Sequence, residues 1–263
     1  MDARLMRHCL LAAARVIVAT VVMSLPALPR AVAQELRPLG PLDAHGTVTY
    51  FVAAGSPSSR YVDSDRDLAT WALGDWERAA HGRLHFVPGE EAGALVRIYW
   101  VDAEGGQYGE TRAMDVNGRR GAAVFVRPDT DALGPDIAKL ARADPLFRDT
   151  IVYLTCVHEI GHALGLRHTA TFADVMYFFG FGGDIPRFFM RYREQLGERA
   201  DIPHVSGLSR GDLAQLDALY APNGARGSSL TVRALAPRSH PSDFEIESAG
   251  STTGLLASIR GAR

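Results

Sequence analysis

Residues 158–168 read His-Glu-Ile-Gly-His-Ala-Leu-Gly-Leu-Arg-His, and their types and spacing are those of a metal site. His158 and His162 are four residues apart, so on a helix their imidazoles project from one face and can bind a single ion. Gly165 can adopt the positive φ with which many helices end, and the turn that follows would bring His168 back to the same ion. Three neutral imidazoles with a fourth position left open are typical of catalytic zinc, whereas structural zinc usually has four protein ligands. The spacing therefore predicts one catalytic Zn2+ bound by His158, His162 and His168.

Glu159 follows the first of these histidines, on the adjoining face of the expected helix. Its carboxylate can accept a proton from a water molecule in the open position of the metal. We therefore predict that Glu159 is a general base rather than a ligand, and that it activates a zinc-bound water for attack on a substrate. The alternative, in which these are ordinary surface or core residues, requires several separately placed residue types to coincide.

The residues that follow carry a family resemblance. Met176 lies in the run Asp174-Val175-Met176-Tyr177, which resembles the Met-turn of the metzincin metallopeptidases. Within that group the chain is most similar to the matrixins, because Thr169 directly follows the third histidine and Leu208–Tyr220 resembles their closing helix. The resemblance spans roughly residues 46–222. It implies a secreted zinc endopeptidase in which Met176 packs beneath the ligands.

The same resemblance implies an α+β catalytic domain of the metzincin type. It would have a twisted mixed five-stranded sheet with two main helices, the zinc helix under the sheet, and a small C-terminal subdomain with the Met-turn and a final helix. Alternating and turn-forming residues predict strands at 47–52, 84–87, 95–101, 108–114 and 122–127, with a hairpin at Asn117-Gly118. Helices are expected at 65–80, about 149–165, 184–196 and about 209–220.

Substrate binding is predicted from the matrixin arrangement, in which an extended protein or peptide substrate adds as a strand to the sheet edge. We expect that edge at the polar strand 108–114. Phe178 and Phe179 stand where matrixins commonly have proline, beside the main specificity pocket. Residues 178–207 form an unusually long segment, which either reshapes that pocket or adds a helix that covers the lower subdomain. The residues predicted to contact substrate are Tyr108, Gly109, Glu110, Thr111, Tyr177, Phe178 and Phe179.

Further metal sites are not supported by the spacing. Residues 97–130 contain no histidine, so we do not expect the second, structural zinc of vertebrate-type matrixins. Several acidic residues could supply oxygen ligands to structural calcium, but no calcium loop is identifiable, and solvated carboxylates are the simpler interpretation: Asp102, Glu104, Asp115, Asp129 and Asp131. His81 and His85 are expected at the surface, Trp71 and Trp76 in the core, and Cys156 as a buried, unreactive thiol.

Domain organisation follows from composition. Residues 1–33 have arginines, an apolar run and Ala31-Val32-Ala33, which predicts a secretory signal peptide cleaved near Ala33. The catalytic domain is expected at 34–222 and a flexible tail at 223–263. Removing the signal takes away four arginines and one aspartate, so the formal charge falls from −2 to −5. We expect a secreted monomer, extracellular or periplasmic, that has no stable membrane anchor and binds no nucleic acid.

Two other functions remain open. One is an exported zinc-binding protein with no hydrolytic activity, although Glu159 would then have no purpose. The other is an exopeptidase, which would need a charged group to bind a substrate terminus, and no such group is identifiable in the sequence.

Overall fold

The fold is described from a computed structural model, which describes residues 39–103 and 107–221. The predicted signal peptide 1–33, the predicted tail 223–263 and Glu104 lie outside these residues. The proposed domain boundaries therefore stay predictions.

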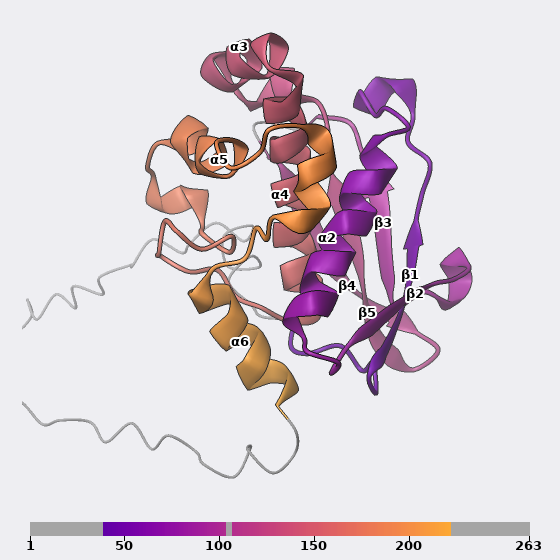
Figure 1. The fold of residues 1–263 in the computed structure, drawn as a ribbon. Helices are drawn as coiled ribbons and strands as arrows, with labels where there is room; N and C mark the ends of the chain where they lie inside the picture. Colours follow the sequence, from indigo (N-terminus) through magenta and orange to yellow (C-terminus); the bar gives the residue numbers. More distant parts are fainter. Residues whose placement is uncertain (1–38, 104–106, 222–263) are drawn as a thin grey trace, which may run out of the picture. The chain divides into compact units, whose positions relative to one another are not determined.

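Five strands form one mixed sheet in the order β2-β1-β3-β5-β4 (Figure 1). The parallel strands are β1 (Thr47–Val52), β2 (His85–Pro88), β3 (Val96–Trp100) and β5 (Arg119–Val126), whereas β4 (Gly109–Val116) pairs antiparallel with β5. This arrangement confirms the predicted α+β class and the mixed five-stranded sheet. Because β4 is last in the order, the prediction that the polar strand lies at an edge is also confirmed.

The hairpin between β4 and β5 turns at Asn117 and Gly118, whose φ angles are +54° and +78°. Positive φ at both central residues is the requirement of a type I′ turn, which explains why this dipeptide predicts a hairpin. Strand β5 begins at Arg119, three residues earlier than predicted. Arg120 is one of the residues added by this earlier start, and its guanidinium donates to the carbonyl oxygen of Ala163.

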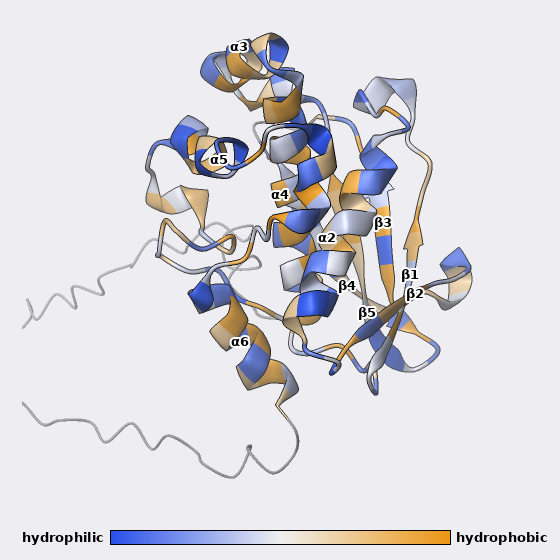
Figure 2. Cartoon of the chain, viewed as in Figure 1, coloured by the Kyte–Doolittle hydropathy of each residue, from blue (hydrophilic) through white to orange (hydrophobic). Residues whose placement is uncertain are grey.

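Two long helices pack side by side against the sheet, α2 (Asp65–Ala79) and α4 (Pro145–Leu164) (Figure 1). A buried hydrogen bond links the two helices: Trp76 of α2 is fully buried and donates its indole Nε1–H to the carbonyl of Val157 in α4 at 2.9 Å. Figure 2 shows polar and apolar residues intermixed along α2, as expected of a helix that covers a core with one side. The core prediction is confirmed for Trp76, whereas Trp71 is half-buried beneath the guanidinium of Arg199.

Helix α4 begins at Pro145, so the predicted start near residue 149 is wrong. Asp144 caps the helix, since its carboxylate accepts the backbone N–H groups of Leu146 and Phe147. Proline at the first helical position suits the cap because its missing N–H would have no helical partner. The end is as predicted: Gly165 has φ +101° and closes the helix. A preceding helix, α3 (Pro135–Ala143), was not predicted.

The C-terminal part contains α5 (Ile185–Arg193) and α6 (Arg210–Tyr220), which confirm the two predicted helices, although α5 ends before the predicted residue 196. Asp184 caps α5 through the N–H of Arg187, and Ser209 caps α6 through those of Gly211 and Asp212. Short 3-10 helices complete the described elements: η1 (Pro57–Ser59), η2 (Glu91–Gly93), η3 (Thr130–Leu133), η4 (Phe179–Phe181) and η5 (Arg199–His204).

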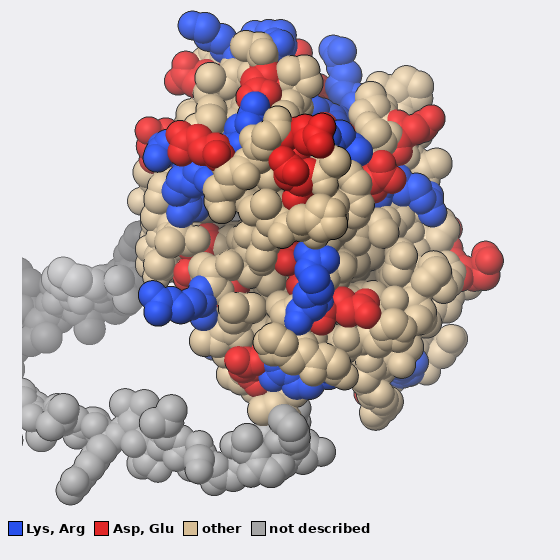
Figure 3. Space-filling model, in the orientation of Figure 1, with Lys and Arg blue, Asp and Glu red and all other residues tan. Residues whose placement is uncertain are grey.

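Acidic and basic side chains are intermixed on the face of the molecule in Figure 3. Among residues 39–103 and 107–221, none of the helices combines the length and the hydropathy needed to span a bilayer.

Candidate metal centre

The three histidines of the sequence string converge on one point. His158 and His162 lie one turn apart on α4, and the turn at Gly165 returns His168 to them. The Nε2 atom of His168 lies 3.3 Å from that of His158 and 3.0 Å from that of His162. A tetrahedral zinc ion with Zn–N bonds of about 2.0–2.1 Å places its nitrogen ligands roughly 3.3–3.4 Å apart. The spacing of the imidazoles therefore fits zinc, and this is the one such cluster among the described residues.

The outer nitrogens of two rings bind the backbone. Nδ1 of His158 lies 2.7 Å from the carbonyl oxygen of Val175, and Nδ1 of His162 lies 3.0 Å from that of Leu166. A carbonyl only accepts, so each Nδ1 carries the hydrogen and each Nε2 presents a lone pair to the cluster. Burial, followed by the neighbouring histidines, lowers the pKa of His162 to about 4 and that of His168 to about 3. The rings are therefore neutral at pH 7, which is the form that binds a metal.

Glu159 of α4 is 6% exposed, and its side chain points toward the edge strand β4. The hydroxyl of Thr111 is 2.7 Å from its Oε2 atom and 2.9 Å from its backbone oxygen. Gly109 leaves room for the carboxylate, because a Cβ atom there would lie 2.6 Å from Cγ of Glu159. Burial raises the pKa of Glu159, and His162 and Thr111 act in the opposite direction. The carboxylate is thus held beside the ligands by the edge strand.

Met176 is fully buried against α4. Gly161, one residue before the second histidine, allows this approach, since a Cβ atom there would lie 2.5 Å from Sδ of Met176. The turn around Met176 is fixed from α6: the buried carboxylate of Asp212 accepts the N–H of Val175 at 2.9 Å and that of Met176 at 3.2 Å. The carbonyl of Val175 is therefore held where it meets His158.

The comparison with known families agrees with this geometry. The sequence model of the matrixin peptidases matches residues 43–181, which is more than half of the chain. The chain belongs to the matrixin family. Matrixins are zinc-dependent metallopeptidases, so this matrixin is a hydrolase of that class, and the three histidines are the described residues that fit its catalytic zinc. No curated protein sequence matches the chain at a significant level.

The predicted substrate residues of this matrixin fall into two groups. Gly109 and Thr111 face Glu159, whereas Glu110 lies on the opposite side of β4 and pairs with Arg112 at 2.6 Å. On the other side of the ligands, the ring of Phe178 packs on His168 with centroids 4.9 Å apart, and the hydroxyl of Tyr177 donates to the carbonyl of Gly182. The two groups meet where Tyr108 contacts Phe179, with centroids 5.3 Å apart.

Two residues that support the Met-turn were missed by sequence reasoning. One is Asp212, and the other is Asp174, which accepts the hydroxyl of Ser209 at 2.6 Å. The only sequence signal for this arrangement is the pattern Ser-x-x-Asp that opens α6, in which Asp212 also accepts the N–H of Ser209. That pattern marks a helix start and does not indicate the distant partner.

The remaining sequence candidates lie apart from the ligands. Cys156 is fully buried, and burial raises the pKa of its thiol, which agrees with an unreactive side chain. His81 and His85 are exposed, and His85 pairs with Glu77 at 2.6 Å. The described acidic candidates for calcium have protein partners: Ser58 for Asp102, the N–H of Gly118 for Asp115, the N–H of Asp131 for Asp129, and Arg142 for Asp131.

Proposed function

We propose that this matrixin is an exported endopeptidase that cleaves proteins within the chain, with Glu159 as its general base. One combination of features carries the proposal. The Nε2 atoms of the three histidines lie at zinc spacing, and Glu159, which directly follows His158, places a buried carboxylate beside them. A binding protein without hydrolytic activity needs the histidines but not that carboxylate.

Bound zinc would supply Lewis acidity, which acidifies a water molecule and polarises a carbonyl. The protein supplies the proton transfer. Glu159 accepts a proton from the attacking water and delivers it to the leaving nitrogen, so that attack requires no free hydroxide and the nitrogen leaves as a neutral amine rather than as an amide anion. Thr111 fixes the carboxylate for this task, because its hydroxyl lies within hydrogen-bond distance of Oε2.

Endopeptidase activity is favoured by the position of β4. One edge of β4 pairs with β5, and its other edge is the outer edge of the sheet. Thr111 of this strand contacts Glu159. An extended substrate that adds to this edge would be bound mainly through its backbone, so the substrate could continue in both directions past the scissile bond. Structural calcium has no part in the proposal, and we expect the active form to be a monomer without nucleic-acid partners.

Export is proposed from the sequence of residues 1–33, which have the charged, apolar and small-residue regions of a signal peptide. Processing after Ala33 would release the chain outside the cytoplasm. N-terminal sequencing of protein recovered from the periplasm or medium tests this step, and an intact N-terminus on all active protein would contradict it.

The decisive experiment uses the full chain, expressed with its own N-terminal segment, and a mixture of internally quenched peptides. One zinc per chain and cleavage that is abolished by chelation and by Glu159→Gln would support the proposal. Mass spectrometry of the products would show internal cleavage, whereas release of terminal residues alone would indicate an exopeptidase. Stoichiometric zinc without cleavage would favour the binding protein.

A further inference from the structure

The rings of Tyr108, Phe179 and Phe189 contact one another, and we call these three residues the aromatic plug. Ring centroids are 5.3 Å apart for Tyr108 and Phe179, 5.4 Å for Tyr108 and Phe189, and 5.9 Å for Phe179 and Phe189. The rings come from three separate segments: the residue before β4, the 3-10 helix η4 after the Met-turn, and α5. The plug therefore joins the edge strand to the insertion that follows Met176.

Two plug residues are chain neighbours of residues that contact the site. Tyr108 directly precedes Gly109, whose backbone lies so close to the side chain of Glu159 that no Cβ atom would fit there. Phe179 directly follows Phe178, whose ring packs on His168. A substrate strand that runs along β4 past Glu159 therefore reaches the plug within about one residue of the scissile bond, since a strand rises about 3.3 Å per residue.

The plug is held in place by its surroundings. Phe189 is 2% exposed, and Phe188 beside it is 3% exposed and packs on Phe179 with centroids 5.0 Å apart. Tyr108 is half-buried against the rings of Phe179 and Phe189, and this burial raises the pKa of its phenol to about 12. Rings packed from three segments cannot move aside without breaking several contacts.

We propose that the aromatic plug restricts one substrate residue to small side chains such as those of glycine, alanine and serine. That residue lies next to the scissile bond, on the side of the bond that faces Tyr108. This inference rests on the proposed function and adds the substrate class. A large side chain at that position would overlap the rings, whereas the opposite flanking position is not limited by them. The specificity then comes from excluded volume rather than from a deep pocket.

A pocket of about 220 Å3 lies on another side of Phe188, lined by residues that include Leu154, Val175 and Tyr192. Its lining contains neither the three histidines nor Tyr108 and Phe179. It offers the alternative destination for a large substrate side chain, which could reach it only if the aromatic rings rearranged. In that case the wild-type enzyme would accept large residues beside the scissile bond.

The test measures kcat/KM of the zinc-loaded full chain on quenched peptides that vary at the two positions flanking the scissile bond, with products identified by mass spectrometry. We expect one flanking position to accept only small residues. Tyr108→Ala and Phe179→Ala, which open the plug from opposite sides, should each improve the ratio of leucine to alanine substrates at that position by about 10-fold or more. Tyr108→Phe should keep the wild-type preference.

Phe181→Ala is the matched control, since Phe181 lies in the same 3-10 helix but is 61% exposed, and its ring packs on Tyr177 and Phe178 instead of Tyr108. It should leave the ratio unchanged. The proposal is overturned if the wild-type enzyme cleaves leucine and alanine substrates equally well at both flanking positions, which can be decided even if a plug variant fails to fold. It is also overturned if folded Tyr108→Ala keeps the wild-type ratio.

A binding measurement separates this inference from the proposed function. Glu159→Gln should retain zinc and bind the same peptides without cleaving them, so fluorescence anisotropy reports their affinities directly. A preference for small residues in binding, with no cleavage by the wild-type chain, would support the plug and refute the peptidase. Cleavage with a preference for large residues at both positions would support the peptidase and refute the plug.

Discussion

The carboxylate of Asp212 accepts the backbone N–H of Met176, across 36 residues of sequence and with no exposure to solvent. Because the same carboxylate binds Val175, whose carbonyl meets His158, we expect Asp212→Asn to weaken zinc binding by about 10-fold to 100-fold. An amide cannot accept as many hydrogen bonds, so the variant should also lose about 1–3 kcal/mol of stability. Competition with a fluorescent chelator and urea unfolding measure the two effects. The control is Asp217→Asn on the same helix, 59% exposed, which should change neither zinc affinity nor stability by more than about 1 kcal/mol.

Thr111→Val should reduce kcat by about 10-fold to 100-fold with little change in KM, because the carboxylate of Glu159 loses the hydroxyl that orients it. Valine has nearly the same shape as threonine, so the fold and the zinc content should be preserved. Thr111→Ser restores the hydroxyl and should recover most of the activity. A Thr111→Val enzyme with wild-type kcat would show that Glu159 needs no such support.

Gly165→Ala should destabilise the chain by more than about 2 kcal/mol and lower its zinc content. The residue has φ +101°, and a Cβ atom would lie 2.2 Å from the carbonyl oxygen of Gly40. Gly82→Ala is the matched control, with φ +78° and no atom within 4 Å of the added carbon, so it should cost only about 1 kcal/mol. Equal losses in urea unfolding would mean that the contact with Gly40 contributes nothing.

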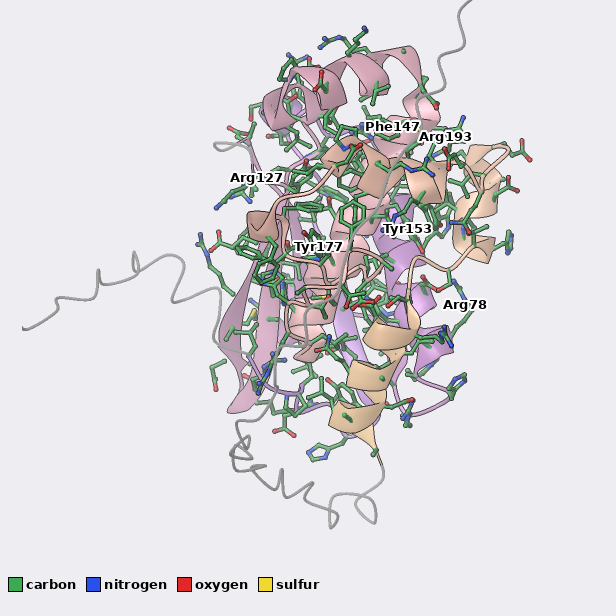
Figure 4. The ribbon with its side chains drawn as sticks, turned by 90° about the vertical axis from the view of Figure 1, so that its left-hand side faces the viewer. Arg78, Arg127, Phe147, Tyr153, Tyr177 and Arg193 are labelled. Atoms are coloured by element: carbon green, nitrogen blue, oxygen red, sulfur yellow. The ribbon has the colours of Figure 1, made fainter. Side chains whose placement is uncertain are left out.

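The pair of Asp144 and Arg193 should make the stability depend on acid pH. Burial acts to raise the pKa of Asp144, but the hydrogen bond from Arg193 and the N–H groups of α4 lower it further than burial raises it. Arg193 and Phe147, both labelled in Figure 4, donate to the two carboxylate oxygens of Asp144, the first through its Nε and the second through its backbone N–H. A lowered folded-state pKa means that the stabilisation is complete above the unfolded value of about 3.9 and is lost as pH falls through the folded value.

Asp144→Asn keeps a helix cap but removes the charge, so it tests that pH dependence. In zinc-free samples, the difference in unfolding free energy between wild type and variant should be present at pH 7 and should vanish below the folded-state pKa. The difference should also disappear at pH 7 in an Arg193→Gln background if the ion pair is its main source. A difference that stays constant down to about pH 2.5 would contradict the assignment.

The parts of the site that are encoded locally could be predicted from the sequence. His158, His162 and His168 lie within eleven residues, and their convergence follows from helical spacing and one glycine. The hairpin at Asn117 and Gly118 is likewise determined by the φ angles that these two residues tolerate.

The parts that depend on distant partners could not be predicted. The role of Asp212 requires knowledge that α6 packs beside the Met-turn. The contact of Tyr108 with Phe189 joins residues 81 positions apart, whose separate patterns indicate only an edge strand and an amphipathic helix. The start of α4 is set by the cap at Asp144 and by Pro145 as first helical residue, four residues before the predicted start. Helix α3 has only nine residues, which is too short for its apolar pattern to predict it.

The division between near and distant contacts has a consequence for the order of folding. The three ligands can meet after closure of a short loop, which costs little chain entropy, as soon as α4 and the turn at Gly165 form. The carbonyl of Val175 is fixed only when Asp212 binds the backbone of the Met-turn. Asp212 follows the insertion 178–207 in the chain and lies in the first turn of α6. During synthesis, an incomplete chain can therefore bring the three histidines together before it can orient His158. The orientation of His158 is therefore complete only when the chain through the start of α6 has folded.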